Sequence, residues 1–199
     1  MGTTYEQICN MALLNVGSKE ILANVRTDRT PAATACNTVI DRTIEAVLEE
    51  FPWPEATAYV SPGLIEEDPS LDWAFAYRYP SDCVMVRRIV TALGRNDPNP
   101  PPFKVGVDAS GKLIYTNEAE PTIEYTFRMV DPALFSATLE DAISWRVAER
   151  IAPSTSRIKD IVKMCQENYR AAIARARVKA ANEQQQEPDM EADHIQARA

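Results

Sequence analysis

Apolar residues recur at helical spacing in the first fifty residues of the chain, which predicts two amphipathic helices. In the first helix, Thr4 stands at the N-cap position, and Gly17 follows the last apolar residue as glycines do where helices end. The apolar face of this helix consists of Tyr5, Ile8, Cys9, Ala12, Leu13 and Val16. We therefore expect a helix over residues 5–16.

The second helix has clearer end signals. Thr30 is placed to cap it and Pro31 takes the first helical position, where a missing N–H costs nothing. Pro52 and Pro54 end it and force the chain into an extended conformation, so we expect Trp53 at the edge of the helical core. The apolar stripe consists of Cys36, Ile40, Ile44, Val47, Leu48 and Phe51.

The middle of the chain is rich in aromatic and β-branched residues, which favour strands. Residues 73–79, 83–92 and 122–129 each predict a strand, and the turn at 108–111 predicts a hairpin between 103–107 and 112–116. In the first of these strands, one face is aromatic and is expected to be core rather than a binding site: Trp73, Phe75, Tyr77 and Tyr79. Four or five short strands suit a small antiparallel sheet or sandwich.

Helical spacing returns after residue 130. One apolar stripe, formed by Leu139, Ala142, Ile143, Val147 and Ile151, precedes Pro153, and the hydroxyls of residues 154–156 are expected to cap a last helix. The stripe of that last helix fades after Ala181 and consists of Ile158, Ile161, Val162, Cys165, Tyr169, Ala172, Ile173 and Ala176.

These patterns predict an α+β fold that is mostly α. Residues 1–56 and 131–181 each supply two helices of a bundle, and residues 57–130 form a β-rich insertion between them. The composition becomes acidic and Gln-rich over residues 182–199, which predicts an extended C-terminal tail that cannot order itself alone.

Charge argues against sequence-independent binding to nucleic acid, because the chain carries a formal net charge of −8. The same charge suits a surface that repels DNA. The last helix is nevertheless locally basic, with Arg157, Lys159, Lys163, Arg170, Arg175, Arg177 and Lys179. Such a helix can bind DNA or dock on acidic neighbours, but the commoner structure is the charged outer face of a core helix.

Residues that carry chemistry are scarce. The single histidine, His194, lies in the polar tail, where a solvated or interface side chain is expected, and the four cysteines lack metal-ligand spacing. Paired carboxylates remain the one catalytic option, at Glu49–Glu50, 66–68 and Glu140–Asp141, but each pair is expected on a solvated face. We therefore expect no enzyme and assign no catalytic, cofactor or metal residue.

Compartment signals are equally plain. Cys9, Cys36 and Cys165 fall on apolar helix stripes, as small buried residues do in proteins of a reducing cytoplasm. The sequence shows no signal peptide and no apolar run approaching the ~20 residues of a membrane span. We expect a soluble chain made in the cytoplasm, with no membrane partner.

Three stretches together resemble the tail tubular protein A and head-to-tail adaptor family of short-tailed bacteriophages. Residues 48–57 (LEEFPWPEAT) are similar to that family's exit from its second helix, and residues 73–83 to its Trp-x-x-x-Tyr-x-x-Pro-x-Asp-Cys signature. Residues 125–132 (YTFRMVDP), followed by two helices, form the third. The resemblance covers residues 4–180 in order, and its motifs are structural.

The resemblance implies a structural virion protein of the neck or tail. Such a subunit assembles with itself as a ring, twelve-fold by analogy with portals, between the portal protein and the tail nozzle or tube protein. DNA would pass through its channel without specific binding, and we expect a channel of net negative charge. Two alternatives remain open: a virion-associated peptidoglycan hydrolase, and a DNA-binding or packaging factor.

The interface residues that we predict are Trp53 and part of the tail. Met190 and Ile195 are the sizeable apolar residues of the tail, and alternating acidic residues can all point to one side of an extended segment. We expect this tail to order on assembly, along the portal or an adjacent subunit; the alternative is that the last helix simply continues. The predicted tail contacts are Glu187, Asp189, Met190, Glu191, Asp193, His194 and Ile195.

Overall fold

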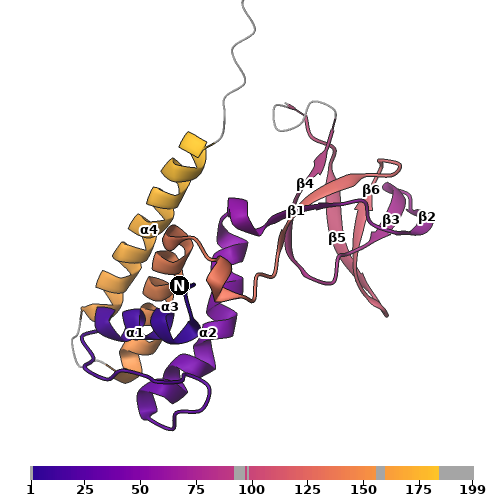
Figure 1. Ribbon diagram of the computed structural model, residues 1–199. Coiled ribbons are helices and arrows are strands. Elements are labelled where there is room, and N and C mark those ends of the chain that lie inside the picture. The colour runs from indigo at the N-terminus through magenta and orange to yellow at the C-terminus, as the bar shows by residue number, and fades with distance from the viewer. Residues whose placement is uncertain (1, 92–96, 98, 156–159, 184–199) are drawn as a thin grey trace, which may run out of the picture.

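The computed structural model describes residues 2–91, 97, 99–155 and 160–183, and these residues form an α+β protein. Figure 1 shows a body of helices beside a separate group of strands, with the N-terminus against the helices. The described helices are α1 (Tyr5–Asn15), α2 (Pro31–Glu50), α3 (Ala137–Thr155) and α4 (Ile161–Glu183). The strands lie between α2 and α3 in sequence, so the predicted α+β class and the order of helices and strands are confirmed.

Local hydrogen bonds explain the ends of α1 and α2. The Thr4 hydroxyl accepts from the Gln7 amide while the Gln7 side chain accepts from the Thr4 amide, which is a capping box. At the other end, Gly17 adopts a φ of 77°, and the amides of Gly17 and Ser18 donate to the Leu14 and Leu13 carbonyls. Thr30 caps α2, as predicted.

Helix α3 is the central element of the helical body. Helices α1, α2 and α4 each pack on it, and they share one continuous core that includes Leu139, Ile143 and Ile151 of α3. The predicted apolar stripes of α1 and α2 are buried in this core, except that Tyr5 is only partly covered. Burial of these stripes, rather than helix propensity, supplies most of the stability of such helices.

The predicted boundary between α3 and α4 was wrong in one respect. Helix α3 continues through Pro153 to Thr155, so Ser154 and Thr155 are not caps of the next helix. Pro153 is tolerated because it stands in the last turn, where one lost backbone bond costs little. The hydroxyls of Ser154 and Thr155 instead donate to the Ile151 carbonyl. Ile158 and Ser156 lie outside the described residues.

The strands form two antiparallel sheets. One has the order β1-β7-β4 and the other the order β2-β3-β6-β5. The β5–β6 hairpin and the strands at β3, β4 and β7 agree with prediction, whereas β1 and β2 were missed. The bounds are β1 Thr57–Val60, β2 Leu64–Ser70, β3 Trp73–Arg78, β4 Cys83–Val90, β5 Phe103–Asp108, β6 Gly111–Thr116 and β7 Thr122–Phe127; the short helices η1 (Pro54–Ala56) and η3 (Pro132–Leu134) flank them.

The two sheets face each other over a small second core, so the β-rich part is a sandwich. Val86 and Ile123 from one sheet pack with Ile114 from the other. In β3, Tyr77 is buried and its hydroxyl is held between the Glu118 carbonyl and the Glu120 amide. The other members of the predicted aromatic face are half-buried.

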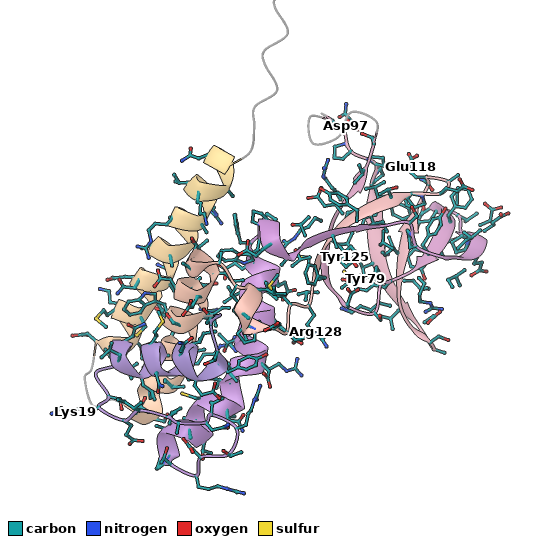
Figure 2. All side chains as sticks on the ribbon, in the orientation of Figure 1. Lys19, Tyr79, Asp97, Glu118, Tyr125 and Arg128 are labelled. Atoms are coloured by element: carbon teal, nitrogen blue, oxygen red, sulfur yellow. The ribbon has the colours of Figure 1, made fainter. Side chains whose placement is uncertain are left out.

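Arg87 of β4 joins the sandwich to the helical body. Its guanidinium donates to the carbonyls of Leu48 (2.7 Å) and Phe51 (3.0 Å) at the C-terminal end of α2, and to the Thr126 hydroxyl (2.8 Å) of β7. Carbonyls at a helix end have no partner within the helix, and a cation also suits that end of the helix dipole. Arg128 adds an ion pair to Glu45 of α2 (3.0 Å), and Figure 2 shows it between the two parts.

Candidate subunit interface

Within the described residues, two surfaces of the helical body leave large apolar side chains exposed. One lies on α1 and the loop that follows it, and the other lies on α4. Each belongs to a helix whose opposite side is packed on α3. Exposed apolar area of this kind is characteristic of sites where another molecule docks.

The first surface is a groove of about 760 Å³, here called the α1 groove. Because Ile8, Ala12 and Leu13 turn toward the core, Met11 and Leu14 are on the outside of α1. Leu14 is 73% exposed, and Ile21 on the facing loop is 85% exposed. Thr3, Gln7, Ser18, Lys19, Glu20 and Glu140 supply much of the rest of the wall.

Two clamps hold the walls of the α1 groove. The Asn10 side chain donates to the Leu22 carbonyl (3.0 Å) and accepts from the Leu22 amide (2.8 Å), which fixes the loop against α1. The Thr3 hydroxyl donates to Glu140 of α3 (2.8 Å), which fixes the chain before α1. Backbone-directed bonds of this kind orient the loop, so the groove is formed before any partner arrives.

The second surface is the outward face of α4. At 100° per residue, the buried positions of α4 centre on one direction, and Met164, Ala171, Ala174 and Val178 centre on the opposite one. Val178 is 62% exposed and Met164 is 38% exposed. Basic side chains border this apolar stripe on both sides: Lys163, Arg170 and Arg177 on one, and Arg175 and Lys179 on the other.

The inward face of α4 is held firmly on its own chain. Gln166 donates to Glu149 of α3 (3.0 Å), and the Tyr169 hydroxyl donates to Glu50 of α2 (2.6 Å). The Arg146 guanidinium lies 4.9 Å from the centre of the Tyr169 ring. Burial, together with Glu50 as acceptor, raises the pKa of the Tyr169 phenol above its ordinary value. These contacts fix the direction in which the outward face points.

The sandwich carries a third hollow, a cleft of about 650 Å³ that Arg78, Lys112 and Arg128 line. Each of these cations already has a partner. Arg78 pairs with Asp108 (3.4 Å), Arg128 pairs with Glu45, and the Lys112 ammonium lies 5.0 Å from the centre of the Tyr79 ring. The cleft is therefore largely neutralised by its own surroundings, which weakens it as an anion site.

Trp53, which we predicted as an interface residue, lies in the core of its own chain. It is 1% exposed, its indole N–H donates to the Val47 carbonyl (2.9 Å), and its ring meets Phe51 edge-on at 5.0 Å. Its role in the described structure is to pack the exit of α2, and it offers no surface to a partner. The predicted tail contacts, Glu187, Asp189, Met190, Glu191, Asp193, His194 and Ile195, lie outside the described residues.

The candidate catalytic carboxylates do not converge on a cleft. Glu49 and Glu50 are exposed at the end of α2, and residues 66–68 are exposed on β2. Glu140 accepts from Thr3, and Asp141 pairs with Arg175 of α4. Among the described residues, no group of three or more His, Cys, Asp or Glu side chains could hold a metal ion.

All four cysteines are buried and unbonded to one another, as predicted for the three on helices. A hydrogen bond with Cys36 and burial both raise the pKa of the Cys9 thiol. A thiol in such a setting packs as a small apolar group and does not act as a nucleophile.

Comparison with known proteins adds no assignment. A scan against protein-family models matches no family, and a search of curated proteins finds no match to this chain. Function is therefore inferred from the residues and the geometry. Within the described part of the chain, no helix is both long and apolar enough to cross a membrane.

The residues of the α1 groove and of the outward face of α4 were not identified from the sequence. A signal was present: Met11 and Leu14 are apolar but fall outside the apolar stripe of α1, and Val178 falls outside that of α4. Isolated exposed apolar residues are common, so the signal becomes informative only when the fold brings several together.

Proposed function

We propose that this chain is a non-catalytic structural subunit of a tailed-bacteriophage particle, the adaptor ring protein that joins the portal to the tail. The observation that carries this proposal is the pair of different apolar surfaces on one helical body, the α1 groove and the outward face of α4. A subunit with two unlike docking surfaces can bind a copy of itself on each side, and such head-to-tail contacts close into rings.

The motifs that resemble the adaptor family have structural roles that suit a rigid ring subunit. In the first motif, Phe51 and Trp53 pack the exit of α2. In the second, Tyr77 and Cys83 lie in the sandwich. Arg87 then bonds the two parts together. A fixed angle between body and sandwich would let every copy in a ring present the sandwich in the same direction, toward portal or tail.

The channel of this ring would carry net negative charge, so that DNA slides through it. An excess of eight acidic residues per chain can supply that repulsion, and the basic edges of α4 would then face protein. Those same basic edges favour a second candidate function, a DNA-binding factor. Affinity for DNA that falls steeply with added salt would support the second function over the first.

The C-terminal residues 182–199 would strengthen the joint by binding the portal or an adjacent subunit on assembly. Their alternating acidic side chains suit a basic groove, and their ordering would occur at that moment. Truncation after Glu183 tests this role. A truncated subunit that joins portal rings as tightly as the full chain would remove the tail from the mechanism.

The proposed function is tested by the oligomeric state of the full chain and by its place in the particle. Native mass spectrometry at the highest soluble concentration should detect closed rings, alone or with portal rings present. Cryo-electron microscopy of the particle should place the ring at the neck. One or two isolated copies per particle would contradict the proposal.

A further inference from the structure

We propose that the outward face of α4 in one copy seats in the α1 groove of the next copy, and that this contact, repeated, is the ring interface. The inference rests on the proposed function, because it names the partner of the surfaces that the ring would use. Met164, Ala171, Ala174 and Val178 are the inserted side, and Leu14 and Ile21 are the receiving side.

These two surfaces cannot meet within one chain. Helix α1 packs on α3 with Ile8 and Leu13, and α4 packs on α3 with Cys165 and Ala172, so both candidate faces point away from the helix that the two share. A contact between them therefore needs a second copy. Because the surfaces differ, a first contact leaves one groove and one α4 face unused, and each can bind a further copy.

The shapes and sizes are compatible. The stripe on α4 has small residues, Ala171 and Ala174, at its centre, so the helix backbone can approach a neighbour closely. Val178 and Met164 project on either side of this centre. A groove of about 760 Å³ can take several such side chains, since it is as large as many small-molecule sites. Leu14 and Ile21, the two most exposed apolar side chains of the groove, would be covered in the contact.

Charge also distinguishes the two sides. Glu20 and Glu140 line the α1 groove, with Lys19 as the one cation in its wall among the described residues. The α4 stripe is bordered by basic side chains, and within the described residues Arg170 and Arg177 form no ion pair of their own. Opposite charge at the edge of an apolar contact selects the partner and orients it, and it makes association sensitive to salt.

Cysteine pairs test the contact directly. The variants Leu14→Cys and Val178→Cys each add one exposed thiol to a chain whose native cysteines are buried. Mixed in equal amounts under mild oxidation, they should form a disulfide-linked pair of chains that joins residue 14 to residue 178. Neither variant can form this bond within one chain. Leu71→Cys, at the exposed β2–β3 turn, replaces Leu14→Cys in the control mixture and should give much less of the mixed product.

Val178→Asp gives an independent readout. Burying an unpaired carboxylate in the interface should weaken assembly by at least about tenfold in the dissociation constant, while the matched control Leu71→Asp should leave it unchanged. Circular dichroism should report native helix content in both variants, because each position is exposed.

The outcomes separate this inference from the proposed function. Rings that form without the Leu14–Val178 cross-link, and that survive Val178→Asp, overturn the interface and leave the adaptor ring standing. A chain that stays monomeric at its highest soluble concentration, alone and with portal rings, overturns both. Loss of DNA affinity on Arg170→Glu with Arg177→Glu, with assembly unchanged, would assign the α4 face to DNA instead.

Discussion

Arg87 should be among the most important single side chains for the joint between the sandwich and the helical body. We expect Arg87→Met to lower the free energy of unfolding by about 2–4 kcal/mol. Methionine keeps most of the aliphatic stem, so the loss would report the hydrogen bonds of the guanidinium rather than its packing.

The magnitude follows from three bonds and one opposing cost. The guanidinium donates to the carbonyls of Leu48 and Phe51 and to the Thr126 hydroxyl, and bonds from a charged donor each contribute roughly 1.5–3 kcal/mol. Two of these bonds share one nitrogen, and burial of the cation lowers the pKa of Arg87, which is a desolvation cost that offsets part of the gain. The variant also leaves carbonyls of Leu48 and Phe51, two buried residues, without this donor.

Urea denaturation measures the change, with far-ultraviolet circular dichroism and tryptophan fluorescence as two probes of the same transition. Arg128→Met is the matched control. Its ion pair with Glu45 is the other charged contact at the joint described above, but the Arg128 side chain is 54% exposed, so the loss should stay below about 1 kcal/mol. A loss for Arg87→Met no larger than that of the control would refute the role given to Arg87.

Three further predictions concern the helical body. Gly17→Ala should cost about 1 kcal/mol in urea denaturation, because Gly17 has a φ of 77° that alanine adopts at a penalty; an unchanged midpoint would contradict this. Burial raises the pKa of the Tyr169 phenol, so the free energy of unfolding should fall as the pH rises above the ordinary value of about 10, where the unfolded chain ionises first, and Tyr169→Phe should flatten that fall. All four cysteines are buried, so a thiol reagent should label them slowly in the native protein and rapidly in denaturant, with Cys83, at 9% exposure, first; rapid native labelling of Cys9 would contradict the packing.

The helices of this protein were predictable because their signals are local. A capping residue, an apolar stripe and a terminating glycine or proline lie within one helix, and Thr4, Gly17, Thr30 and Pro31 all act at the ends that the sequence indicates. The hairpin of β5 and β6 was predictable for the same reason, since its turn lies between its two strands.

The missed strands show where local signals end. Strand β2 is exposed along nearly its whole length, contains Pro69, and includes Asp68 at a φ of 51°. Its sequence gives no strand pattern, and it is a strand because β3 pairs with it. Strand β1 is likewise held at the sheet edge by β7, which lies more than sixty residues away in the chain.

The sequence by itself determined the helices, the central strands and the order in which they occur, because their hydrogen bonds and apolar spacing are set by neighbouring residues. Tertiary structure alone decided that Trp53 is buried, that Arg87 bonds the end of α2, and that Leu14 and Val178 are left exposed on unlike surfaces. Each of these facts depends on residues that are distant in sequence and adjacent in space. Whether an apolar side chain is core or interface is fixed only when the remaining elements have taken their places around it.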